Sequence, residues 1–139
     1  MDREFKILKI DHVAIAVNNL KESKNIFDLL GMSLTQEEFI PNEKVNVLKI
    51  KTEDKNHTLE LLEPSDDSSV INKFINKKGQ GIHHIALEVD DIYSALDFLK
   101  SKSVKLVYDD PQKGADNSLI TFIHPSSTSG VLIELCQKS

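Results

Sequence analysis

The chain has 139 residues, of which 40% are hydrophobic and 28% charged. This composition is typical of one soluble globular domain and excludes disordered, collagen-like and membrane-spanning classes. A net charge of −5 argues against nucleic acid or an anionic membrane as a partner, so small molecules are the leading partner class. The N-terminal sequence lacks the apolar segment of a secretory signal, which predicts a cytoplasmic protein. The single cysteine, Cys136, cannot form an internal disulfide and is expected to be a buried, inert thiol.

The chain contains an internal repeat. Residues 10–20 (IDHVAIAVNNL) align without gaps with residues 82–92 (IHHIALEVDDI). In each copy a strand pattern precedes apolar residues at helical spacing, and the polar pairs at 18–19 and 90–91 are candidate helix caps. Three shorter strands are then predicted in each half: 33–36, 45–50 and 58–62, followed by 105–108, 118–123 and 131–135. Each half therefore reads βαβββ.

The repeat predicts an α+β fold built from paired βαβββ modules. We expect a single domain over residues 1–139, with pseudo-repeats at about 8–64 and 80–137. The apolar spacing within residues 68–78 predicts a short helix that connects the two modules.

Side chains alternate across a strand, so residue parity indicates what each face presents. His12 and His84 lie on the strand face opposite the apolar one, and Glu60 and Glu134 occupy matching positions in the last strand of each half. Two modules related by an approximate two-fold axis would bring these four residues to one concave surface. Imidazole and carboxylate suit Zn²⁺, Co²⁺, Ni²⁺, Mn²⁺ or Fe²⁺. A single strand histidine is more often structural, but duplication in register favours a metal site.

Three further histidines have other expected roles. His83 has the opposite parity to His84 and is expected to be structural or to support a ligand. His57 is expected in an exposed loop, and His124, which precedes a proline, in a turn or pocket wall.

Long motifs in the chain resemble the vicinal oxygen chelate superfamily, and within it the methylmalonyl-CoA epimerases. The resemblance covers nearly the whole chain and rests on residues 10–17 (IDHVAIAV), 59–64 (LELLEP), 78–92 (KGQGIHHIALEVDDI), 122–125 (FIHP) and 130–135 (GVLIEL). It implies a cup-shaped mixed sheet with helices outside, the glyoxalase-like fold.

The resemblance also implies a metal centre and a partner. His12, His84 and Glu134 match the family's ligands, and Glu60 occupies the remaining ligand position. Co²⁺ is the metal favoured by the resemblance, with Mn²⁺, Ni²⁺ or Zn²⁺ as alternatives. The implied substrate is an acyl-CoA, and the implied assembly is a homodimer.

The implied reaction interconverts (R)- and (S)-methylmalonyl-CoA by 1,1-proton transfer through a metal-stabilised enolate. Two acid/base groups must flank C2, and Glu134 and Glu60 are the candidates. One described family member has a further glutamate base where this chain has Val47. Glu43 is the nearest carboxylate and a third candidate. Its alignment with the family's glutamate is left open. The loop at 113–118 also departs from the family's usual glycine-rich form, so no substrate-binding residues are assigned.

Other functions remain open. Lactoylglutathione lyase (glyoxalase I) has a similar fold and ligand pattern, but it holds glutathione with arginine, and Arg3 is the only arginine here. An extradiol dioxygenase would need two histidines and one carboxylate rather than four ligands. A non-catalytic resistance protein that binds a small molecule would need no metal ligands; with tryptophan absent and aromatic residues at 6%, the sequence gives it little support.

Overall fold

The computed structural model describes residues 1–139, which divide into two compact units. One unit is continuous and comprises residues 12–83, whereas the other combines residues 1–11 with residues 84–139. None of the helices is both long and apolar enough to cross a membrane.

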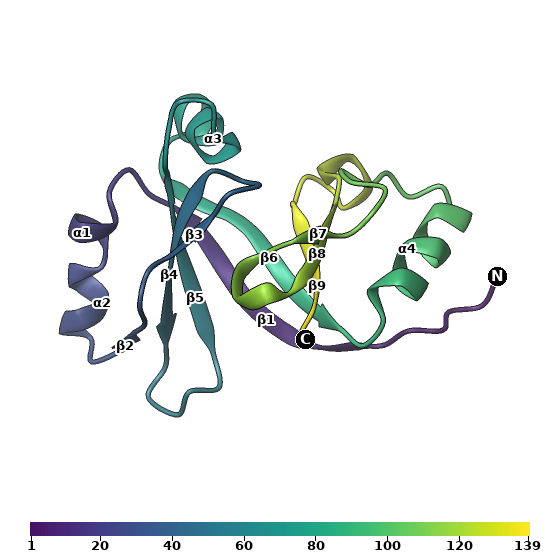
Figure 1. Ribbon diagram of the computed structural model, residues 1–139, viewed down its shortest axis with the longest axis horizontal. Helices are drawn as coiled ribbons and strands as arrows, with labels where there is room; N and C mark the ends of the chain where they lie inside the picture. Colours follow the sequence, from purple (N-terminus) through teal and green to yellow (C-terminus); the bar gives the residue numbers. More distant parts are fainter. The chain divides into compact units, whose positions relative to one another are not determined.

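The unit of residues 12–83 is a mixed sheet with α1 and α2 on one side and α3 at one end (Figure 1). Strand β1 runs parallel to β5, β5 pairs antiparallel with β4, and both β2 and β3 pair antiparallel with β4. The elements in chain order are β1 (Ile7–Ala16, from His12 on), α1 (Leu20–Ser23), α2 (Asn25–Leu29), β2 (Ser33–Leu34), β3 (Glu38–Ile40), β4 (Val45–Lys51), β5 (Thr58–Pro64) and α3 (Val70–Lys78).

Helices α1 and α2 cover the apolar face of this sheet. Leu20 of α1 and Phe27 of α2 pack with a cluster that includes Leu48, Ile50 and Leu61 from β4 and β5. Because neighbours along a strand face opposite sides, Lys49 and Glu60 lie on the other face of the same strands. Burial of the apolar face thus fixes the face on which the polar residues emerge.

The second unit repeats this pattern. Strand β6 runs parallel to β9, β9 pairs antiparallel with β8, and β8 with β7. Its elements are β6 (Gly81–Val89, from His84 on), α4 (Ile92–Ser101), β7 (Gln112–Lys113), β8 (Leu119–Ile123), β9 (Ile133–Gln137) and the short 3₁₀ turns η1 (Ala115–Asn117) and η2 (Pro125–Ser127). Ile92, Ala95 and Leu96 of α4 pack against Val89 and Leu135. The predicted pair of βαβββ modules is confirmed.

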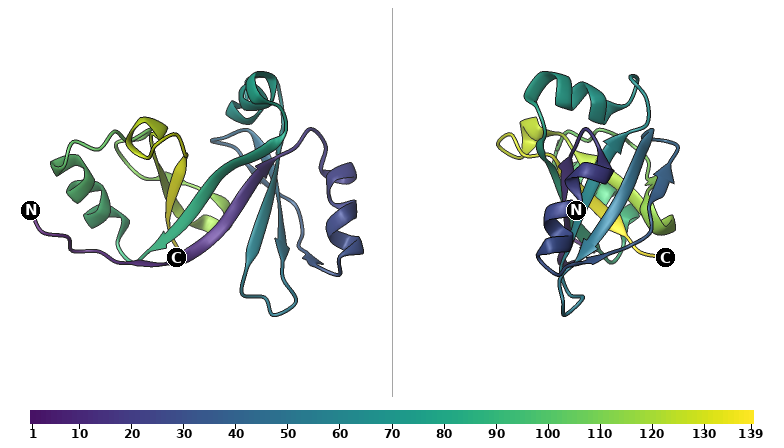
Figure 2. Two further views of the ribbon diagram at one scale, coloured as in Figure 1. Left: turned by 180° about the vertical axis from the view of Figure 1, so that it is seen from behind. Right: turned by 90° about the vertical axis from the view of Figure 1, so that its left-hand side faces the viewer.

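The N-terminal segment belongs to this second unit, not to the unit that follows it in sequence. The Lys6 N–H donates to Asp90 Oδ1 at 2.8 Å, and the Asp90 N–H donates to the Lys6 carbonyl at 3.2 Å. Phe5 is 9% exposed, and its ring meets Phe98 of α4 edge-on at 5.8 Å. The backbone of the N-terminal segment runs toward the same end of this unit as α4 (Figure 2). Residues before the first repeat therefore complete the second unit's core.

Several predicted elements need correction. The strand predicted at 105–108 is reduced to a single bridge between Leu106 and Ile123. Next to this bridge, the Tyr108 carbonyl accepts from the Thr121 side-chain hydroxyl at 3.1 Å, a contact outside the backbone ladder. Two short strands, β3 and β7, were not predicted. The connecting helix is confirmed as α3.

Candidate active site

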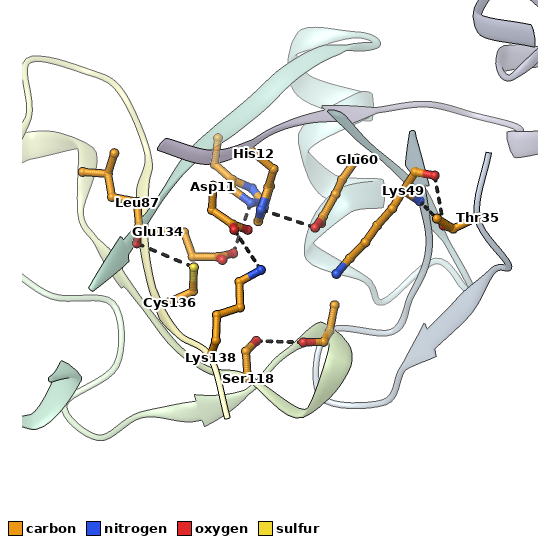
Figure 3. Close-up of polar contacts among 12 residues, drawn as sticks. Asp11, His12, Thr35, Lys49, Glu60, Leu87, Ser118, Glu134, Cys136 and Lys138 are labelled. Atoms are coloured by element: carbon orange, nitrogen blue, oxygen red, sulfur yellow. Dashed lines mark hydrogen bonds and ion pairs between the residues drawn. The ribbon is translucent and has the colours of Figure 1, made fainter. Parts of the chain in front are cut away.

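The first unit holds a buried pair formed by His12 and Glu60. His12 lies on β1 and Glu60 on the parallel strand β5, where Glu60 is the register partner of Ala14. The His12 Nδ1 and Glu60 Oε2 atoms are 3.3 Å apart, and each residue is only 5% exposed (Figure 3). Small alanines at 14 and 16 on the same face of β1 leave room for the glutamate side chain.

The second unit holds an equivalent pair formed by His84 and Glu134. Glu134 is the register partner of Ala86 on the parallel strands β6 and β9, so each histidine again lies two residues before the alanine that pairs with the glutamate. The His84 Nε2 and Glu134 Oε1 atoms are 3.1 Å apart, and both residues are buried. The duplication inferred from sequence is therefore reproduced in three dimensions, one pair in each unit.

These donors fit a divalent cation. A buried carboxylate is costly unless a positive charge or hydrogen bonds compensate it, and both glutamates lie beside an imidazole. Neutral imidazole nitrogen and carboxylate oxygen are the ligands used for zinc, cobalt, nickel and manganese. Each unit thus presents one nitrogen ligand and one oxygen ligand.

Neighbouring groups fix the surroundings of the second pair. The His84 ring meets the Phe122 ring edge-on at 5.3 Å, which restricts the imidazole's orientation. Asp11, which precedes His12, belongs to this unit and forms an ion pair with Lys138 at 2.8 Å (Figure 3). Partial burial acts to lower the pKa of Lys138, but the hydrogen bond and charge of Asp11 outweigh it and leave the pKa raised.

Cys136 is an inert thiol, as the sequence predicted. It is buried on β9, and its Sγ donates to the Leu87 carbonyl at 3.6 Å. Burial raises the pKa of this thiol, and the negative charge of Glu134 raises it further. The thiol therefore remains protonated at neutral pH and is no nucleophile.

The remaining predicted residues lie in turns or loops, with one exception. Glu43 is in the turn between β3 and β4, where its carbonyl accepts from the Ser69 hydroxyl at 3.1 Å. His57 is exposed in the loop after β4, and His124 begins the η2 turn, with its Nδ1 accepting from the Ser126 N–H at 3.0 Å. His83 lies on β6, and its ring packs edge-on against Phe74 at 4.9 Å, which supports a structural role.

Lys49 is a residue of interest that sequence reasoning missed. It lies on β4 as the direct antiparallel partner of Glu60 and is half-buried. A single lysine in a strand carries no signal by itself, because only the strand register reveals which residue it faces. That Lys49 lies opposite Glu60 could have been found only from the pairing of β4 with β5.

The chain is similar to known proteins in both sequence and fold. A family model described as the Glyoxalase/Bleomycin resistance protein/Dioxygenase superfamily matches residues 11–122. The chain belongs to this superfamily, and the glyoxalase-like fold expected from the sequence is confirmed.

Similar relatives carry a more particular description. The mitochondrial methylmalonyl-CoA epimerase of Dictyostelium discoideum is 38% identical over 132 residues, which cover 94% of this chain and 78% of the relative. The crystal structure of methylmalonyl-CoA epimerase from Mycobacterium tuberculosis is 37% identical, with a TM-score of 0.91 over 96% of this chain and 89% of that chain. A structure of a methylmalonyl-CoA epimerase in complex with methylmalonyl-CoA and NH4+ is 31% identical, with a TM-score of 0.89 over 96% of each chain.

Proposed function

We propose that this protein is a metal-dependent epimerase that interconverts (R)- and (S)-methylmalonyl-CoA. The observation that carries the proposal is the duplicated buried pair, His12 with Glu60 and His84 with Glu134, in a chain whose relatives are named methylmalonyl-CoA epimerases. The substrate described for the solved relative is an acyl-CoA, and we assign the same substrate class here.

The four residues of the two pairs are the proposed ligands of one divalent ion. Co²⁺ is the metal we favour, with Mn²⁺, Ni²⁺ or Zn²⁺ as alternatives. When bound, the ion supplies positive charge that stabilises the negative charge developing on the substrate's oxygens as C2 loses its proton.

The protein's own carboxylates move the proton. The C2 hydrogen is acidic because C2 lies between a thioester and a carboxylate. Inversion requires removal of the proton on one face of C2 and its return on the other, which needs two acid/base groups. Glu134 and Glu60, one from each unit, are the proposed pair, and Glu43 of the β3–β4 turn is a third candidate.

Incorporation of deuterium at C2 tests the proposal. We expect metal-loaded protein in heavy water to exchange the C2 hydrogen of methylmalonyl-CoA, metal-stripped protein to lose this activity, and Glu134→Gln to reduce the rate by about a hundredfold or more. Circular dichroism would verify that the variant is folded. Methylglyoxal with glutathione serves as the parallel substrate. Turnover of the glutathione adduct alone would replace the proposal with a lactoylglutathione lyase, and silence on both substrates would favour a binding protein.

The cellular setting forms part of the proposal. We place the protein in the cytoplasm as a homodimer, with residues 1–139 working as one domain. Light scattering on purified protein should give twice the mass of one chain, and a monomeric mass would contradict the assembly without affecting the chemistry.

A further inference from the structure

Lys49 lies on the same sheet face as the proposed ligand Glu60. The two residues are direct partners in the antiparallel pairing of β4 with β5, so their Cβ atoms are about 5 Å apart and point to the same side. Leu48 and Leu61, one position further along each strand, pack into the helix-covered cluster on the opposite side. Figure 3 shows the two side chains extending from neighbouring strands in the same direction.

The backbone of Lys49 is held firmly by Thr35. The Thr35 N–H and its hydroxyl both donate to the Lys49 carbonyl at 2.9 Å, and the Lys49 N–H donates to the Thr35 hydroxyl oxygen at 3.2 Å. This clamp ties β4 to the segment that leaves β2, and it fixes the base of the lysine side chain. The residue is thus anchored rather than carried on a mobile loop.

The position of the Lys49 ammonium suits the C2 carboxylate of methylmalonyl-CoA. The charged groups on this face of the unit include His12, Glu60, Lys49 and Glu38, the last being the partner of Val47 on β3. Lysine has a longer stem than glutamate, so its ammonium reaches beyond the Glu60 carboxylate. An ammonium there attracts an anion bound above the sheet, and methylmalonyl-CoA has a carboxylate attached directly to C2.

We propose that Lys49 binds the C2 carboxylate of the substrate and selects for acyl-CoA esters that have one. This inference rests on the proposed function and adds to it the residue that distinguishes a 2-carboxyacyl-CoA from a plain acyl-CoA. In this role Lys49 attracts the substrate carboxylate and takes no part in proton transfer.

A matched pair of ligands tests the proposal directly. Propionyl-CoA differs from methylmalonyl-CoA only in lacking the C2 carboxylate, so binding of both is measured by calorimetry on protein loaded with Co²⁺. We expect Lys49→Met to weaken methylmalonyl-CoA binding about tenfold or more, the size of one charge-assisted hydrogen bond, and to change propionyl-CoA binding by less than about twofold. Lys49→Arg keeps the charge and should retain most of the affinity for methylmalonyl-CoA.

Two controls separate this role from a structural one. Lys21→Met removes an exposed lysine of α1 in the same unit and should leave both affinities unchanged. Cobalt content and thermal unfolding are measured for every variant, so a loss of metal or of fold is detected independently of binding. Equal weakening of both esters by Lys49→Met, or no weakening of either, would overturn the proposal while the epimerase function stands. If wild-type protein binds neither ester, both the inference and the proposed function fail.

Discussion

Two glutamates three positions apart on β5 have different roles. Glu60 faces His12, whereas Glu63 faces the opposite side, where its Oε2 accepts from the Leu20 N–H at 3.0 Å and its Oε1 from the Asn46 side-chain amide at 3.1 Å. Glu63 therefore satisfies an N–H group at the start of α1 that the helix leaves unpaired. Residue parity alone distinguishes a proposed metal ligand from a residue that holds a helix in place.

We predict that Glu60→Ala affects metal affinity and that Glu63→Ala affects stability. Glu60→Ala should lower the affinity for Co²⁺ by at least about tenfold, because it removes one ligand. Glu63→Ala should leave the metal affinity unchanged and lower the free energy of unfolding by about 1–2 kcal/mol, because it leaves the Leu20 N–H unsatisfied. Calorimetric metal titration and urea denaturation measure the two effects, and a loss of metal affinity in Glu63→Ala would contradict the division of roles.

The sequence predicted the proposed ligands but not their surroundings. His12, Glu60, His84 and Glu134 could be found because each pair is duplicated in register, and duplication by chance is improbable. Lys49 and the pair of Asp11 with Lys138 could not be found, since neither is duplicated and each depends on which strands or segments become neighbours. A local sequence pattern predicts which face of a strand a residue occupies. Which residue it faces on the next strand depends on how the strands pair in the folded protein.

The sequence offers two candidate N-cap residues for each of the helices α1 and α4. In the structure the second residue of each pair is the cap. Asn19 accepts from the Glu22 N–H to cap α1, and Asp91 accepts from the Ser94 N–H to cap α4. The other members have different partners: the Asn18 N–H donates to the Gln80 side chain, and Asp90 accepts from Lys6. In each polar pair, one residue caps the helix and the other bonds to a segment distant in sequence. Local propensity cannot predict the distant contact.

The α4 cap makes a pH-dependent contribution to stability. The Ser94 backbone N–H and hydroxyl donate to Asp91 and lower its pKa below the ordinary 3.8. A carboxyl with a lowered pKa in the folded state stabilises the fold above its unfolded pKa, and this contribution disappears as the pH falls through the folded pKa. The urea midpoint of Asp91→Ala should therefore lie below that of wild type above about pH 4 and converge with it at lower pH.

A neighbouring substitution provides the control for this cap. Asp97→Ala changes an exposed aspartate in the middle of α4. Its urea midpoint should stay close to the wild-type value across the same pH range. A gap between wild type and Asp91→Ala that does not narrow in acid would show that the cap does not depend on the carboxylate's charge.

At the scale of the molecule, the sequence repeats and the compact units have different boundaries. The repeats suggest halves at about 8–64 and 80–137, but residues 1–11 belong with residues 84–139. Self-similarity cannot reveal this, because Phe5 precedes the first repeat and has no counterpart in the second. Its assignment depends on the apolar cluster around Val89, Leu96 and Leu135, which buries its ring.

We predict that Phe5→Ala destabilises the protein far more than its place near the terminus suggests. Removal of a largely buried phenylalanine from a packed cluster costs about 3 kcal/mol or more. Phe39 is 53% exposed, and Phe39→Ala should cost less than about 1 kcal/mol. Chemical denaturation of the two variants makes the comparison, and similar midpoints would mean that the N-terminal segment contributes little to the second unit.

The division of the chain also sets an order of events during translation. Residues 12–83 form a continuous unit, so all of its strands can pair as soon as residue 83 has left the ribosome. Residues 1–11 emerge before residues 12–83 but must wait for residues 84–139, which contain every partner of Phe5 and Asp11 described above. During that interval the nascent chain exposes Phe5 to solvent and to chaperones. Residues 1–11 are thus synthesised before the unit of residues 12–83 but reach their final place after it.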